Sequence, residues 1–130
     1  MKIGWLAAVL LMAGCGGQEA KEPAFPASIA PAWTRGAVQP IASGQLPAIV
    51  SAAGLVHGWQ TEYRAGVAVA KVEAYALRNS AQGLDLVQRW KPQRDNAQFY
   101  TEHYLINIAW SGTKHDELAA LVRSLPKALP

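Results

Sequence analysis

Three stretches of the chain carry the side-chain pattern of β-strands. Residues 59–64 alternate between an apolar and a polar side, residues 67–77 place small side chains at every second position, and residues 99–110 are rich in aromatic and β-branched types. Gly66 separates the first two stretches and suits a tight turn, because glycine accepts a positive φ. We expect the small-residue side of 67–77 to let a helix pack closely. In the last stretch we expect one face to hold Tyr100, Tyr104, Ile106, Ile108 and Trp110.

Three further stretches predict helices. Residues 45–53 have Pro47 where the first turn of a helix tolerates a missing N–H, and Gly54 suits the position just past a helix end. Residues 80–90 gather apolar side chains on one half of a helical wheel, and we expect Ser80 to cap this helix. The last helix follows a stripe with i, i+3, i+4, i+7 spacing, formed by Leu118, Leu121, Val122 and Leu125.

The order of these elements predicts the fold class. Thr113 and Asp116 have the spacing of a capping box at the start of the last helix, and Pro126 predicts its end. The chain therefore reads as helix, strand, strand, helix, strand, helix. This order predicts an α+β domain, in which a small antiparallel sheet of three or more strands has helices packed on one face.

The first residues carry a different pattern. Lys2 precedes an apolar run over residues 3–13, and this run is too short for a bilayer core, which needs about 20 residues. A positive start, a short apolar run and small residues before position 15 are typical of a processed secretion signal. Cys15 is the only cysteine of the chain, so it has no partner for an intramolecular disulfide. An uncleaved membrane anchor and an ordinary signal peptide with a fortuitous cysteine remain as alternatives.

The segment Met12-Ala13-Gly14-Cys15 resembles the lipobox of bacterial lipoproteins, with Met12 in place of the usual Leu. The resemblance implies that residues 1–14 are a lipoprotein signal peptide and that Cys15 becomes the acylated first residue. It also implies membrane lipid as a partner and a place in the cell envelope. Because Gly16 rather than Asp follows the cysteine, this place is the outer membrane, facing the periplasm, if the organism is Gram-negative.

The chain after the cysteine divides at about residue 40. Residues 15–40 are rich in Gly, Pro and Ala without a period, and we expect a flexible spacer. Residues 41–130 are long enough for a single small α+β domain. The whole chain has a formal net charge of +3 at pH 7, which is too mild to indicate a nucleic-acid partner.

Residue types that carry catalysis show no local pattern. His57, His103 and His115 lie far apart in the sequence, and no pair has the spacing of metal ligands on a helix. The chain also lacks a Gly-x-Ser-x-Gly elbow and a glycine-rich phosphate loop. We therefore expect no metal, no cofactor and no enzymatic activity.

One basic cluster is a candidate contact surface. Arg89, Lys91 and Arg94 surround Trp90 and could contact an envelope protein, a glycan or lipid headgroups, although cations are also favoured at the end of a helix. Aromatic side chains could stack on sugars if they line an open groove, whereas strand alternation favours a place in the core. The aromatic residues that decide between these two interpretations are Trp59, Tyr100 and Trp110.

A second resemblance covers residues 75–87, which follow the alternating run. This segment resembles part of the exosortase-associated periplasmic proteins of exopolysaccharide systems, and it implies a hairpin turn at residues 80–83 instead of a helix start. Three functions follow from the sequence. The first is a membrane-anchored, non-enzymatic binding or accessory module for an envelope protein or polymer. The alternatives are an exopolysaccharide-secretion accessory protein and a small envelope hydrolase or transferase.

Overall fold

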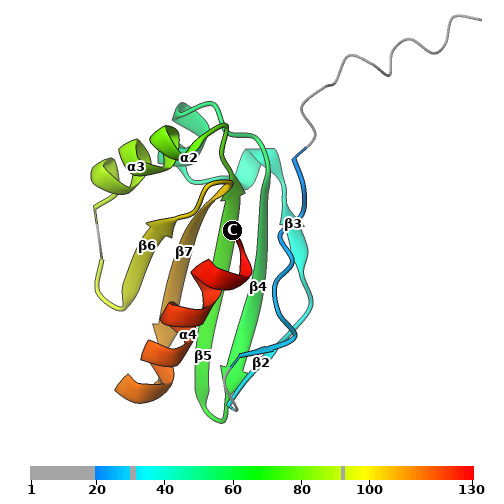
Figure 1. Ribbon diagram of the computed structural model, residues 1–130, viewed down its shortest axis with the longest axis vertical. Coiled ribbons are helices and arrows are strands. Elements are labelled where there is room, and N and C mark those ends of the chain that lie inside the picture. The colour runs from blue at the N-terminus through cyan, green and yellow to red at the C-terminus, as the bar shows by residue number, and fades with distance from the viewer. Residues whose placement is uncertain (1–19, 30–31, 92) are drawn as a thin grey trace, which may run out of the picture.

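In the part of the chain that the structure describes, seven strands form one antiparallel sheet (Figure 1). The computed structural model describes residues 20–130 except residues 30, 31 and 92. Neighbouring strands follow the order β1-β2-β4-β5-β7-β6, and β3 also pairs with β4. The strands are β1 (Ser28–Ile29), β2 (Trp33–Arg35), β3 (Gln39–Ile41), β4 (Gly58–Ala65), β5 (Ala68–Ala76), β6 (Asn96–Tyr100) and β7 (Tyr104–Ser111).

One face of the sheet, which we call the alanine face, is covered by the C-terminal helix α4 (His115–Ala128). Alternate residues of β5 point to this face and are fully buried, among them Ala70, Val72 and Ala74. Leu121 and Leu125 of α4 belong to the same core. The predicted small-residue strand under a helix is therefore confirmed, and Figure 1 shows α4 lying across β5 and β7.

The opposite face carries a second, smaller core at one end of the sheet. Tyr75 and Leu105 are register partners on β5 and β7, and both point away from the alanine face. Two short helices cover them there, α2 (Ala48–Ala52) and α3 (Ser80–Arg89). The predicted α+β fold, an antiparallel sheet with packed helices, is confirmed. The helices are divided between the two faces of the sheet. Tyr75, a large side chain at an odd-numbered position of β5, points to the second face and is covered there by α2 and α3.

Residues 20–40 do not form the predicted spacer. Phe25, Ile29 and Trp33 are buried in the core of the alanine face. The hydroxyl of Tyr63 donates to the Pro26 carbonyl at 2.7 Å, and the hydroxyl of Tyr104 donates to the Lys21 carbonyl at 2.7 Å. The boundary predicted at residue 41 is therefore too late. The segment lacks a period because its strands have only two or three residues each.

Strands β2 and β3 act as one strand with an extra residue. Arg35 pairs with Tyr63 and Gln39 pairs with Gln60, so four steps on one strand oppose three steps on β4. This is the arrangement of a β-bulge. The hydroxyl of Thr61 lies within hydrogen-bonding distance of two bulge carbonyls, 3.2 Å from Gly36 O and 3.0 Å from Ala37 O. The bulge therefore keeps its polar backbone groups paired inside the sheet.

The stretch predicted as one strand over residues 99–110 is a hairpin. The chain reverses between β6 and β7, where Thr101 N donates to Tyr104 O at 2.8 Å and Tyr104 N donates to the Thr101 hydroxyl at 3.1 Å. The reversal moves Tyr100 to the face of α3, opposite Leu105. The other four members of the predicted face do share the alanine face.

The predicted helices differ from the structure at their ends. Of the predicted helix over residues 45–53, only α2 forms, with Pro47 as its N-cap, and a separate 3₁₀ helix (Ser43–Gln45) precedes it. Helix α3 begins where expected, but Asn79 rather than Ser80 caps it by accepting a bond from Gln82 N at 2.9 Å. The helix also means that the hairpin turn implied at residues 80–83 is wrong.

Helix α4 has neither the predicted capping box nor the predicted stop. Its N-cap is Lys114, and no side chain caps it; the Thr113 hydroxyl instead donates to the Lys114 carbonyl at 3.1 Å. Pro126 lies inside the helix, which continues to Ala128 because a proline removes only one intrahelical bond near a helix end. This extension brings Leu129 into the core.

The predicted signal peptide and Cys15 lie outside the described residues. Within residues 20–130, less the three positions named above, no helix is both long and apolar enough to span a bilayer.

Candidate binding face

Part of the sheet face opposite the alanine face is not covered by α2 and α3. We call this part the polar face. The alternation that buries Trp59, Thr61 and Tyr63 turns the residues between them to this side. Four strands contribute polar side chains to it, which are Gln60, Glu62 and Arg64 from β4, Lys71 and Glu73 from β5, Asn107 from β7, and Asn96 and Gln98 from β6.

A row of hydrogen bonds crosses three strands of the polar face. Gln98 Nε2 donates to Asn107 Oδ1 at 2.8 Å, and Asn107 Nδ2 donates to Glu73 Oε1 at 2.9 Å. Lys71 Nζ lies 3.7 Å from Glu73 Oε2, which makes an ion pair. Asn107 is only 7% exposed, so its amide is held in one orientation by both neighbours. The row of hydrogen bonds therefore fixes the positions of the donor and acceptor groups of these side chains.

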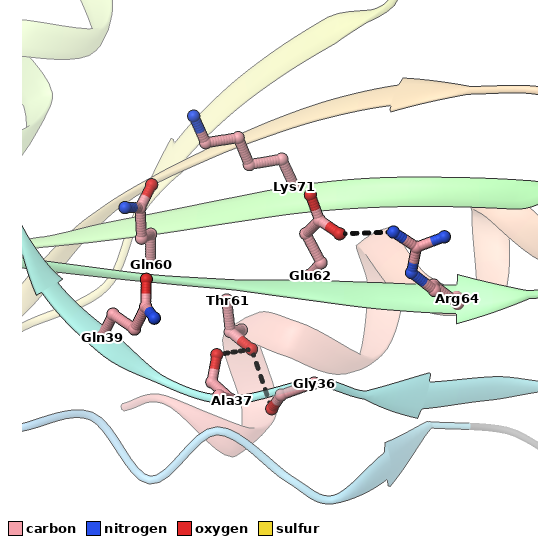
Figure 2. A pocket seen from close by; sticks show the side chains of 8 residues that line it. All are labelled: Gly36, Ala37, Gln39, Gln60, Thr61, Glu62, Arg64 and Lys71. Atoms are coloured by element: carbon pink, nitrogen blue, oxygen red, sulfur yellow. Dashed lines mark hydrogen bonds and ion pairs between the residues drawn. The ribbon is translucent and has the colours of Figure 1, made fainter.

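Beside this row the face is hollowed into an open cavity of about 380 Å³. Figure 2 shows Gln60, Glu62, Arg64 and Lys71 standing on the same side of β4 and β5, while Thr61 turns to the bulge carbonyls. Arg64 Nη2 and Glu62 Oε1 are 2.9 Å apart. Among the described residues, the side chains of Gln39 and Gln60 make no hydrogen bond to protein groups. The cavity thus offers amide, carboxylate and cationic groups to a ligand.

A buried tyrosine marks the boundary between the polar face and the smaller core. Tyr75 is fully buried, and no hydrogen-bonding partner for its hydroxyl is present in the described part of the chain. Burial, and to a smaller degree the adjacent Glu73 carboxylate, raise the pKa of this phenol well above its ordinary value. The phenol is therefore neutral and serves as a packing group against Trp90, whose ring centroid is 6.3 Å away.

The four residues of the predicted basic cluster have different surroundings. Trp90 is half-buried and packs on the smaller core, so it does not offer a free ring. Arg89 pairs with Asp85 one helical turn earlier, with 3.1 Å between Nε and Oδ2. Lys91 and Arg94 are exposed. Within the described residues, no hydrogen bond or ion pair joins these four side chains to the cavity.

The three aromatic residues singled out in the sequence also lie in different parts of the fold. Trp59 is 8% exposed and lies in the core of the alanine face, and Trp110 packs against the same core. Tyr100 is 37% exposed on the other side of the sheet, at the edge strand β6. The three side chains therefore do not line one groove: Trp59 is a core residue, and Trp110 packs against that core.

The three histidines occupy separate places. His57 stacks on Trp59 with 6.3 Å between ring centroids, and His103 Nδ1 lies 3.2 Å from the carbonyl oxygen of Pro130. His115 is exposed at the start of α4. In residues 20–130, apart from the undescribed positions, no group of three or more His, Cys, Asp or Glu residues could hold a metal ion.

The polar face was not singled out in the sequence, because its residues are simply the polar alternates of predicted strands. Their contact across β6, β7 and β5 depends on strand register, for example Asn107 opposite both Gln98 and Glu73. One feature of the sequence could have indicated this face. Several of the polar strand positions hold amide side chains, whereas a face that only meets water is often rich in lysine. Comparison of the chain with protein-family models, with curated proteins and with solved structures finds no match.

Proposed function

We propose that this protein is a membrane-anchored cell-envelope lipoprotein whose domain is a non-enzymatic binding module for an envelope protein or polymer. The lipobox-like segment ending at Cys15 supports the anchor. The polar face supports the binding role and is its contact surface. The basic cluster around Trp90 is not part of this surface, and its tryptophan packs on the smaller core.

The observation that carries the proposal is the row of hydrogen bonds through Asn107. The amide of Asn107 is nearly buried, and the side chain of Glu73 is only 18% exposed. Polar side chains on a surface that contacts only water are usually more exposed than this. Partly buried polar groups are costly unless they are paired, and a paired network is rigid. Rigid donors and acceptors lose little conformational entropy when a ligand binds. The row is therefore suited to recognition.

The charges beside the cavity favour a neutral or mixed-charge partner. Lys71 and Arg64 are cations, and Glu62 and Glu73 are anions close to them. Such a balance disfavours a polyanion, which needs clustered cations. Amide and charged groups in alternation match the hydroxyls of a glycan or the backbone of a peptide equally well.

A photo-crosslinking experiment tests the proposal in intact cells. A photoreactive amino acid is placed at Lys71 on the polar face or, as the matched control, at Arg123 on the exposed side of α4. We expect a crosslinked product from position 71 and none from position 123. Sensitivity of the product to protease or to glycosidase then distinguishes a protein from a polymer. No product from position 71, or equal products from both positions, would contradict the proposal.

A further inference from the structure

The described chain begins at one end of the sheet, which we call the tether end. Ala20 lines two neighbouring cavities there, of about 630 Å³ and 300 Å³, which also share Ala76 and Leu77. Val56 and His57 line the smaller cavity, and His103 lines the larger one. Figure 1 shows this end at the top of the long axis, where the blue segment starts at about the height of α2 and α3.

Few residues connect Cys15 to the tether end. Only four residues separate Cys15 from Ala20. Five residue steps reach at most about 18 Å even when fully extended. If Cys15 carries acyl chains in a bilayer, the domain cannot move farther from that bilayer than this length allows.

The tether end also exposes an apolar side chain. Val56 is 58% exposed in the loop that follows α2, beside Ala20. The charges around it are mixed, because Lys21 and Arg78 are exposed and so is Glu22. An apolar contact with lipid therefore does not depend on a particular headgroup charge.

The opposite end of the sheet lies far from the tether. Strand β4 runs from Gly58 at the tether end to Ala65 at the β4–β5 turn, which is about 23 Å along a strand. Val67 is at that turn and is 88% exposed. Figure 1 shows the turn at the bottom of the long axis. Arg64, which lines the polar cavity, is near this far end.

We propose that the tether end is the surface that faces the bilayer, with Val56 against the lipid, and that the β4–β5 turn projects away from it. This inference rests on the proposed acylation of Cys15. It deepens the proposed function, because it places the polar face where a partner can reach it from the aqueous side of the membrane. The occupant of the tether end is the bilayer in which the protein is anchored.

Two exposed valines provide a matched test. Val56→Cys and Val67→Cys each add one thiol, which is labelled with a fluorophore in the full-length lipidated protein after reconstitution. The vesicles contain phosphatidylcholine and a headgroup spin-labelled phosphatidylcholine that quenches nearby fluorophores. Because the two sites differ in height by about 20 Å, we expect quenching at position 56 to exceed that at position 67 by about twofold or more.

The outcomes separate the orientation from the anchor. Protein that floats with the vesicles but shows equal quenching, or stronger quenching at position 67, overturns the proposed orientation and leaves the anchor intact. Protein that does not float overturns the anchor, and the orientation with it. Circular dichroism of both variants should show an unchanged fold, because both valines are exposed.

Discussion

The indole N–H of Trp33 donates a hydrogen bond to the backbone carbonyl of Glu117 at 2.8 Å. The bond joins strand β2, near the start of the described chain, to the first turn of helix α4. Trp33 is also fully buried. Trp33 therefore closes the core of the alanine face, and the described part of residues 20–40 is not the free spacer that the sequence predicts.

Trp33→Ala should lower the free energy of unfolding by about 3–5 kcal/mol, the usual cost of removing a large buried aromatic side chain. Urea unfolding of the chain without residues 1–14, the predicted signal peptide, measures the change. Trp110→Ala is the control, since Trp110 is only half-buried, and its cost should be clearly smaller. Equal costs for the two tryptophans would contradict the role given to residues 20–40.

Ala70→Leu should destabilise the domain by about 1–3 kcal/mol, because a larger side chain does not fit between β5 and the α4 leucines. Val69→Leu is the matched control, since Val69 points to the opposite face and is half-exposed. We expect its effect to be within about 0.5 kcal/mol. Denaturant midpoints compare the two variants, and a neutral Ala70→Leu would mean that α4 packs less closely than described.

Asn107→Ala should cost about 1–3 kcal/mol, because it removes the amide that accepts from Gln98 and donates to the Glu73 carboxylate in a poorly exposed place. The same variant should weaken crosslinking from position 71. Gln60→Ala is the control, since its side chain bonds to no other described residue, and it should leave stability unchanged. A stable Asn107→Ala variant would show that the row contributes nothing to the face.

Stability should fall as the pH rises through the alkaline range. Burial raises the pKa of Tyr63 to about 12 from the ordinary 10.0. Between these two values the unfolded chain has lost the phenolic proton and the folded chain still binds it, so each pH unit costs up to about 1.4 kcal/mol from this group. Below pH 10 the contribution of the Tyr63 phenol to the free energy of unfolding is fully present.

Tyr63→Phe checks this origin of the alkaline loss. The variant also loses the hydrogen bond to Pro26, so it should be less stable below pH 10, but its stability should fall less steeply between pH 10 and 12. Urea unfolding at fixed pH values gives the slopes. An unchanged slope would show that other groups cause the alkaline loss.

Segments with a sustained period were predictable from the sequence. Strands β4 and β5 and helices α3 and α4 each contain enough residues for alternation or a helical stripe to appear. Strands β1 to β3 could not be found in this way, because they are short, contain Pro40 and are interrupted by the bulge at Gly36. The reversal at Thr101 was missed because no glycine or proline marks it.

The polar face illustrates a different limit. Polar residues on alternate strand positions look the same in a sequence whether they meet water or a ligand. Their meaning depends on which strands are neighbours, and β6 pairs with β7 only because of the hairpin that the sequence pattern concealed. The basic cluster around Trp90 had a clear local signal, yet the fold turns its tryptophan inward.

The proposed anchor at Cys15 underlies both proposals, and the mass of the N-terminal tryptic peptide tests it most directly. In membrane-bound protein, cleavage after Lys21 should release residues 15–21 with acyl groups on Cys15. Alkaline hydrolysis of the ester-linked acyl chains should then lower the mass of this peptide by the mass of those chains. A peptide that begins at Ile3, or an unmodified peptide that begins at Cys15, would contradict the lipoprotein account.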